Sequence, residues 1–296
     1  MSGICSPSTG KPYGIKRICG VTGYPRSSFY AQIRNKDGGP QPRKRGPRCE
    51  IGDPELLGCI RADLDRSPFH GEGHRKVWAR LKYGQGLRVS RKRVLRLMRE
   101  NQLLSPHRRP QGMPRLHTGE ITTHEPNVMW GTDATRVFTL EDGYVWVFEA
   151  VEHWNAECVG WHVCKRGDRF AAIEPVLMGL AEHFGAVGAD IGRGLCLRMD
   201  HGTQYLSDHF RNQLRYWGIA PSFAFLEEPQ TNGVVERFFR TLKEQVVYGG
   251  TFYSITDLRE AIEGFIHRYN AQWRIEKNGF LSPRQAREEH RARAAA

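Results

Sequence analysis

The pattern of hydrophobic and polar positions changes once along the chain, near residue 126. Before that point apolar residues recur at the three- and four-residue spacing of helices, as at Val77 and Leu81 and again at Val94 and Leu97. After it they alternate or gather in short runs typical of strands, as in VMWGTDATRVFTL and YVWVFEAVEHW. We therefore predict a helical region followed by a region built around a β-sheet.

The helical region is predicted over residues 54–102, with YGQG as a break and Ser90 as the N-cap of the helix that follows. Residues 14–34 could form two further short helices around a glycine turn, a weak helix-turn-helix pattern. Two segments rich in Gly, Pro and basic residues, 35–48 and 105–126, are typical of linkers.

The sheet region begins with two strands joined by the hairpin signal EDG, and CVGWHVCKR is a third strand. A helix with Asp168 as its possible N-cap, the strand LCLRMD, a helix ending at Gly218 and the strand APSFAFL follow. This order predicts a mixed five-stranded α/β sheet with helices on its faces, and residues 255–270 and 282–292 as C-terminal helices. The alternating aromatic residues Tyr144, Trp146 and Phe148 are expected in the core.

Composition is that of a globular protein with a real core, since 39% of the 296 residues are hydrophobic. No apolar run approaches the roughly 18 residues needed to span a bilayer, and the N-terminus lacks the apolar stretch of a signal peptide. The seven cysteines include no CxxC pair, which disfavours a disulfide framework or zinc site and favours reduced cytosolic thiols. A GxxxxGK phosphate loop is also missing, which argues against an ATPase.

The net charge of +12 is concentrated in the first part of the chain. Residues 1–118 hold 25 Lys and Arg against 8 Asp and Glu, whereas residues 119–296 hold 19 against 24. Such asymmetry favours a front part that binds nucleic acid over one that is merely a soluble basic domain. The helix after YGQG is the strongest candidate for DNA contact, although a solvated basic face is the alternative; its candidate residues are Arg91, Lys92, Arg93 and Arg96.

Two aspartates stand at positions that strands normally avoid or that mark strand ends. Asp133 lies within the first strand, where aspartate is disfavoured; an exposed or edge position would be the plain explanation. Asp200 closes the strand LCLRMD and precedes HGTQY, where ordinary turn chemistry would also explain it. Ligand sites in open α/β sheets gather at the carboxyl ends of strands, so a functional role stays open for both.

A third carboxylate, Glu236, falls on a helix that is predicted to start near Asn232. The apolar stripe of that helix has helical spacing, at Val235, Phe238, Phe239, Leu242 and Val246. Glu236, Arg240 and Lys243 share the neighbouring face, where a surface ion pair is the simpler reading. If the three carboxylates converge, their hard oxygen atoms suit Mg²⁺ or Mn²⁺, and two such ions would serve in-line phosphoryl transfer, with Arg240 and Lys243 placed for phosphates.

The segments WGTDATRV, RMDHGTQY and PQTNGVVERFFRTLKEQ, with 35 residues between Asp200 and Glu236, resemble the DDE catalytic core of retroviral integrases and bacterial transposases. The resemblance is closest to the OrfB-type transposases of two-frame insertion sequences and covers nearly the whole chain. The stretch from GEGHRKVW to MRENQLL resembles the helix-turn-helix segment of that family.

The resemblance implies an RNase H-like core in which Asp133, Asp200 and Glu236 are the catalytic residues and bind the metal. It implies that Lys243 contacts DNA near the reacting phosphate, while Gln230 and Asn232 touch the DNA end. The tail carries IEKN where the family usually has a Pro-His portion, so the role of that stretch is open. No other cofactor is implied.

Double-stranded DNA, at transposon ends and at the target, is the implied partner, together with further copies of the chain and an upstream OrfA product or frameshift fusion. The implied setting is the bacterial cytoplasm, at the nucleoid, without a membrane. The expected domains are a basic N-terminal segment (1–50), a helix-turn-helix-like region (51–104), a linker (105–126), an integrase core (127–250) and a helical extension (251–296).

Two other functions fit parts of the sequence. A DNA-binding regulator with an inactive integrase-like core would share the basic front part but not require the carboxylates. A nuclease with the same core could instead act on RNA–DNA hybrids. The histidines His153, His162 and His183 lack metal-ligand spacing and are expected to be structural, and His201 is expected to belong to the turn after Asp200.

Overall fold

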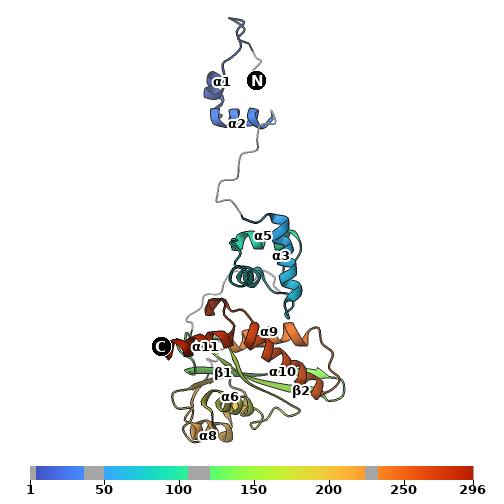
Figure 1. Ribbon diagram of the computed structural model, residues 1–296, viewed down its shortest axis with the longest axis vertical. Helices are drawn as coiled ribbons and strands as arrows, with labels where there is room; N and C mark the ends of the chain where they lie inside the picture. The colour runs from blue at the N-terminus through green and yellow to red at the C-terminus, as the bar shows by residue number, and fades with distance from the viewer. Residues whose placement is uncertain (1–4, 37–49, 106–120, 224–232, 296) are drawn as a thin grey trace. The chain divides into compact units, whose positions relative to one another are not determined.

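The computed structural model describes residues 5–36, 50–105, 121–223 and 233–295 (Figure 1). The chain divides into two compact units, residues 1–49 and residues 50–296. In the first unit, helices α1 (Ile15–Thr22) and α2 (Arg26–Lys36) flank Gly23, whose φ of 67° ends α1 in the left-handed conformation that glycine adopts readily. The prediction of two short helices around a glycine turn is confirmed.

The second unit begins with a helical region that has its own hydrophobic core. It contains α3 (Asp53–Arg66), α4 (His74–Ala79), the π-helical turn η1 (Arg80–Gly84) and α5 (Arg91–Glu100). Leu56 and Ile60 of α3 pack with Val77, Leu81 and Val94, as the helical spacing predicts. Ser90 caps α5, because its hydroxyl accepts a hydrogen bond from the Arg93 backbone N–H at 3.3 Å.

A mixed five-stranded sheet follows, as predicted. Its strands are β1 (Met129–Thr139), β2 (Gly143–Glu152), β3 (Cys158–Cys164), β4 (Cys196–Met199) and β5 (Ala220–Phe223). Their order is β3-β2-β1-β4-β5, with β1, β2 and β3 antiparallel and with β4 and β5 parallel to β1. The central strand is therefore β1, and the hairpin register pairs Thr139 with Gly143 across the predicted EDG turn.

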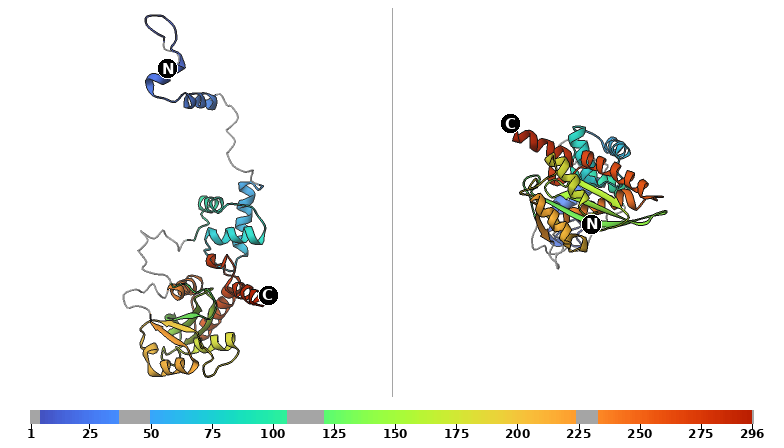
Figure 2. Two further views of the ribbon diagram at one scale, coloured as in Figure 1. Left: turned by 90° about the vertical axis from the view of Figure 1, so that its left-hand side faces the viewer. Right: turned by 90° about the horizontal axis from the view of Figure 1, so that it is seen from below.

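Helices cover both faces of the sheet (Figures 1 and 2). One face carries α6 (Glu174–Phe184), α7 (Thr203–Leu206) and α8 (Asp208–Trp217), with Trp130 and Phe148 of the sheet in the shared core. The other carries α9 (Gly233–Leu242), η3 (Lys243–Val247) and α10 (Ile255–Gln272), which pack on Val137 and Val147. Strand alternation separates these two sets of side chains.

The C-terminal extension returns to the sheet through η4 (Glu276–Asn278) and α11 (Pro283–Ala294). Ser282 and Gln285 form a capping box at the start of α11. The buried Arg287 of α11 forms ion pairs with Glu157 and, at 3.6 Å, with Glu152. Its anchoring contacts therefore reach residues that lie about 130 positions earlier in the chain.

Two local predictions were wrong. Helix α6 begins at Glu174 and not near Asp168, whose carboxylate instead accepts hydrogen bonds from the Phe170 and Ala171 backbone N–H groups of a preceding turn. Tyr144, next to the hairpin turn, is 65% exposed, whereas Phe148 on the same strand is buried. No helix in the described part of the chain is long and apolar enough to cross a membrane.

Candidate active site

Asp133 lies in the middle of the central strand. It pairs with Glu149 of β2 and is half-buried, so the edge-strand explanation for a mid-strand aspartate does not hold. The Asp133 carboxylate accepts a hydrogen bond from the Ala134 backbone N–H at 2.7 Å. Its side chain belongs to the alternating set that faces α9 and α10, because Val137, four residues along, packs in that core.

Asp200 is the residue that directly follows β4. Strand β4 is parallel to β1 with Gly131 opposite Arg198, and two more steps of this register bring Asp200 level with Asp133. Asp200 is exposed and accepts a hydrogen bond from the Gly202 backbone N–H at 2.8 Å, which shapes the turn. The turn interpretation and the site interpretation of this residue are therefore compatible.

Glu236 lies in the first turn of α9, exposed on the face next to the buried stripe. The predicted stripe is confirmed: Val235, Phe238, Phe239 and Leu242 are buried against the sheet, and Val246 is partly buried. Packing of that stripe fixes the rotation of the helix about its axis, and so sets the direction in which Glu236 projects.

The charges of the other two carboxylates act on Asp133. The pKa of Asp133 is raised to about 6, first by burial and then by the negative charges of Asp200 and Glu236. The Ala134 N–H and the positive charge of Lys243 act in the opposite direction. Three separate elements, β1, the end of β4 and α9, therefore bring their acidic side chains into one region.

This donor set suits a hard divalent cation, because it consists of carboxylate oxygens whose mutual repulsion a cation would relieve. In the described residues, however, no three His, Cys, Asp or Glu side chains are close enough together to hold a metal ion jointly. The chemistry of the site therefore fits a divalent ion, while the side chains here are not gathered around a common point.

Lys243 begins the π-helical turn η3, where the wider winding follows directly after α9. It is half-buried, and its charge acts on both Asp133 and Glu149. π-Helical turns occur often at functional sites, and this one adjoins the carboxylates. Arg240, one turn earlier, is exposed. The predicted DNA-end residues Gln230 and Asn232 lie outside the described residues.

Glu149 is a fourth carboxylate that the sequence interpretation missed. It is fully buried opposite Asp133, and neither of its side-chain oxygens has a hydrogen-bond partner in the described part of the protein. Burial raises its pKa well above the ordinary value, and the charge of Asp133 raises it further. Counting outward from the EDG turn would have found it, because hairpin register alone places residue 149 opposite residue 133.

Most of the basic side chains proposed for DNA contact on α5 form ion pairs within the protein. Arg93 binds Asp53 and the Ile51 carbonyl, and Arg96 binds both Asp53 and Glu100. Arg91 forms an ion pair with Glu276 at 2.9 Å. Lys92 is exposed. Three of the four candidates thus hold parts of the chain together.

Comparison with known proteins agrees with this arrangement of elements. The family model described as an HTH-like domain matches residues 56–111. Two models described as integrase core domain match residues 123–225 and 218–274, and together they span the sheet, α9 and α10. The chain therefore carries an HTH-like domain followed by an integrase core domain. The three carboxylate segments all lie within the integrase core.

The chain is similar to proteins of Escherichia coli insertion elements. It is 29% identical over 242 residues to transposase InsD for insertion element IS2A/D/F/H/I/K, an alignment that covers 79% of this chain and 78% of that one. It is 26% identical over 289 residues to the insertion element IS2A uncharacterized 48.2 kDa protein, covering 95% of this chain but 66% of the longer relative.

Among solved structures, the catalytic core domain of BIV integrase is 20% identical, with a TM-score of 0.43, covering 57% of this chain and 99% of that one. An integrase-type core implies dependence on a divalent metal ion, which agrees with the donor chemistry of Asp133, Asp200 and Glu236.

Proposed function

We propose that the chain cleaves DNA at the ends of an insertion element and joins the resulting 3′-OH to target DNA, with Asp133, Asp200 and Glu236 as its catalytic carboxylates. The observation that carries this proposal is geometric: the register of β1 and β4 brings Asp200 level with Asp133, and the buried stripe of α9 packs on the face of the sheet that carries Asp133. Acids that different elements bring to one part of a sheet are candidates for a joint catalytic role.

The carboxylates would hold Mg²⁺ or Mn²⁺, with two ions expected, and bound ions would stabilise charge on the attacking and leaving oxygens of an in-line displacement. The protein's own contribution is to hold the three carboxylates in position. Strand β1 fixes Asp133 in the centre of the sheet, the turn after β4 orients Asp200, and the packed face of α9 aims Glu236. A rigid arrangement of this kind keeps reacting groups aligned.

Lys243 is proposed to contact a phosphate next to the reacting bond, because its charge already acts on the carboxylate region. Arg240, Gln230 and Asn232 are proposed to contact DNA further along the same segment. On α5, Lys92 is the exposed candidate, while Arg91, Arg93 and Arg96 would reach DNA only if their ion pairs rearranged. These contacts would supply salt-sensitive affinity.

Double-stranded DNA is the proposed partner, and pairing of two element ends calls for at least two copies of the chain on DNA. An upstream OrfA product, or a frameshift fusion with it, is proposed as a further partner. The place of action that follows is the bacterial nucleoid in the cytoplasm. The proposed division into domains remains 1–50, 51–104, 105–126, 127–250 and 251–296.

Strand transfer by the purified chain tests the function directly. Labelled duplex ends with a free 3′-OH are incubated with target DNA and Mg²⁺ or Mn²⁺, using wild type and Asp133→Asn, Asp200→Asn and Glu236→Gln. We expect joined product from wild type and a loss of more than about 1000-fold in each variant, since each substitution removes a charged group from the site. DNA affinity should stay within about twofold, since the lost groups are acidic.

The controls separate the rival functions. Product that is absent from wild type, and also from a frameshift-fused chain, would favour a DNA-binding regulator with an inactive core. Metal-dependent cleavage of an RNA–DNA hybrid without joining of DNA ends would favour a hybrid nuclease. A variant that loses DNA binding in proportion to its loss of product would contradict the assignment of the three carboxylates to chemistry.

A further inference from the structure

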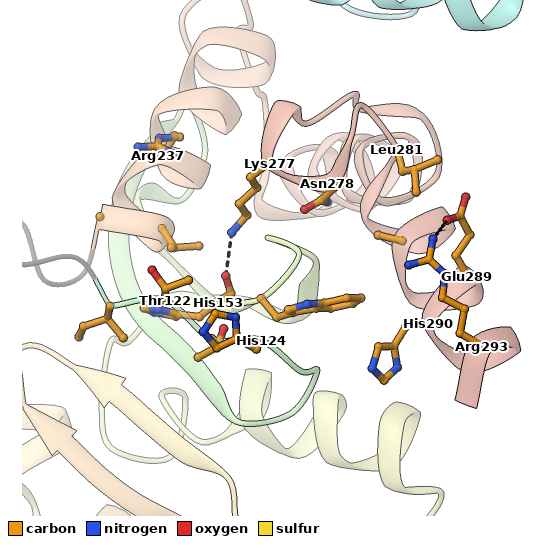
Figure 3. A pocket seen from close by; sticks show the side chains of 16 residues that line it. Thr122, His124, His153, Arg237, Lys277, Asn278, Leu281, Glu289, His290 and Arg293 are labelled. Carbon is orange, nitrogen blue, oxygen red and sulfur yellow. Dashed lines mark hydrogen bonds and ion pairs between the residues drawn. The ribbon is translucent and has the colours of Figure 1, made fainter. Parts of the chain in front are cut away.

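A pocket of about 730 Å³ lies beside the first turn of α9, at the end of the sheet where β2 finishes (Figure 3). Its walls come from residues 121–124, from the two residues after β2, from the start of α9 and from the C-terminal extension. Gly233, Val234 and Arg237 are its contribution from α9. Glu236 belongs to the same helical turn, so the pocket adjoins the proposed catalytic region along one short stretch of helix.

The pocket is electropositive. Arg237, Lys277 and Arg293 line it from three different elements. Among the described lining residues one is acidic, Glu289, and Arg293 pairs with it at 3.1 Å. The start of α9 adds the positive end of a helix dipole. These features together favour an anionic ligand.

His153 supplies a second, independent observation. It is 95% buried at the wall of the pocket, and neither ring nitrogen has a hydrogen-bond partner in the described residues. Burial, with the nearby charges of Lys277 and Arg198, lowers its pKa to about 4. The neutral ring therefore offers one donor and one acceptor. Buried polar groups are normally paired, so the wall of the pocket contains polar atoms that the described residues leave unsatisfied.

Lys277 is held at the pocket by the main chain of the same histidine. Its ammonium group donates a hydrogen bond to the His153 carbonyl at 2.7 Å, and Figure 3 shows it reaching from the extension toward β2. Asn278, its neighbour, donates to the Asn155 carbonyl at 2.9 Å. Both residues come from the IEKN stretch, whose departure from the family pattern left its role open. That stretch forms one wall of the pocket.

An aromatic pair gives the pocket a surface suited to a base. Trp154 and His290 meet edge to face, with ring centroids 5.2 Å apart, and both line the cavity. Aromatic side chains beside a cationic groove are the usual means of holding unpaired bases. The volume has room for one or two nucleotides and is too small for a base-paired duplex.

We propose that this pocket binds one or two unpaired nucleotides of a DNA strand that passes Glu236, with the phosphate held by Arg237 and the start of α9, and the base held by Trp154 and His290. The proposal rests on the proposed function for the identity of the strand. The phosphate chemistry alone would also suit a free mononucleotide or inorganic phosphate, and the experiment below distinguishes these sources.

The test compares duplex ends that carry a short single-stranded overhang, 5′ or 3′, with blunt ends of the same sequence. Binding of the full-length chain is measured by fluorescence anisotropy with EDTA present, so no chemistry is required. We expect tighter binding to one overhang than to the blunt end. Arg237→Gln should reduce that preference about 5- to 10-fold, the effect of losing one charge-assisted hydrogen bond.

Two further variants make the result specific. His290→Ala removes part of the aromatic surface and should also reduce the preference, whereas Arg211→Ala removes an exposed positive charge of α8 and should not. Equal binding of overhang and blunt ends by wild type would overturn the proposal. So would equal effects of Arg237→Gln and Arg211→Ala on the overhang preference.

Position and source are tested with the same materials. A photoreactive base in the overhang should crosslink to peptides that contain Trp154 or His290, identified by mass spectrometry; crosslinks confined to other segments would contradict the proposal. A deoxynucleoside monophosphate should displace the overhang better than inorganic phosphate, and equal displacement would reduce the pocket to an anion site. Because binding and crosslinking need no catalysis, failure of strand transfer would leave these outcomes unaffected.

Discussion

Two groups of carboxylates in and beside the same sheet differ in how they are partnered. Where β2 leaves the sheet, Glu152 accepts hydrogen bonds from Trp130, from Trp154 and from the backbone N–H of Asn127, and Arg287 pairs with both Glu152 and Glu157. Further along the hairpin, Asp133 accepts a hydrogen bond from one adjacent backbone N–H group.

Glu149, opposite Asp133, has none in the described residues. The first group is satisfied by the protein itself, as buried charges in a stable core usually are. The second group lacks such partners, so ionising it is costly, and a stable fold tolerates this where a ligand balances the charge. Partnering, more than burial, therefore separates the structural acids from the acids proposed to be functional.

The largest expected effect on stability comes from removing Arg287, the cation that pairs with Glu152 and Glu157. Arg287→Ala leaves two buried carboxylates without their cation, and we expect a loss of about 3–5 kcal/mol in the free energy of unfolding, measured by urea denaturation. Arg284→Ala, which removes an exposed charge from the same helix, should change it by less than about 0.5 kcal/mol. Equal effects of the two substitutions would show that the ion pairs of Arg287 do not hold α11 in place.

Removing the charge of Asp133, in the group without partners, should raise the free energy of unfolding. An ionised Asp133 is destabilising in the metal-free protein because its folded-state pKa, about 6, lies above the ordinary value of 3.8. A raised pKa means that stability present below about pH 4 is lost as the pH rises through 6. We therefore expect Asp133→Asn to abolish strand transfer and yet stabilise the metal-free protein by about 1–2 kcal/mol above pH 6.

Thermal unfolding in EDTA over this pH range measures the Asp133 effect. The control is Asp142→Asn, because hydrogen bonds from Lys165 and from the Ile255 N–H lower the pKa of Asp142. A lowered pKa gives the opposite sign: Asp142 stabilises the protein above the ordinary aspartate pKa and loses that contribution as the pH falls. An Asp133→Asn protein less stable than wild type at pH 7 would show that Asp133 is a structural acid.

Much of the fold follows from local patterns in the sequence. Strand alternation, the EDG turn and the stripe of α9 depend on neighbouring residues, and each was predicted correctly. The positions of Asp133 and Asp200 on neighbouring strands could also be inferred, because hairpin and crossover rules constrain the order of strands. Glu149 could have been found by the same counting, since register is a local property of the hairpin.

Other features depend on contacts between distant parts of the chain. Arg287 and Glu157 are 130 residues apart, and Arg93 and Asp53 are 40 apart. Spacing along a helix gives no sign of such partners, so the sequence favoured DNA contact for the cations of α5, with a solvated face as the alternative. The start of α6 at Glu174 was missed for a different reason: Asp168 makes the hydrogen bonds of a cap to a turn that ends before the helix begins. The pocket beside α9 combines four segments that no local pattern connects.

The smallest expected effects are on α5. There, as with the two carboxylate groups, one cation has partners within the protein and its neighbour is exposed. Arg93 is satisfied by Asp53 and the Ile51 carbonyl, while Lys92 is exposed. We expect Arg93→Ala to lower the free energy of unfolding by about 1–2 kcal/mol, through loss of a partly buried ion pair and a hydrogen bond. Lys92→Ala should leave stability within about 0.5 kcal/mol of wild type.

DNA binding completes this last comparison. If Lys92 contacts a phosphate, Lys92→Ala should weaken binding equally across sequences and reduce the slope of log affinity against log salt by about 1. Arg93→Ala, measured where it remains folded, should leave that slope unchanged, because its guanidinium is already neutralised by Asp53. The reverse result, with the slope reduced by Arg93→Ala alone, would mean that the Asp53 ion pair opens on DNA. An ion pair in the free protein would then not exclude a role in DNA binding. The difference between partnered and unpartnered carboxylates in the sheet would not apply to the cations of the helices.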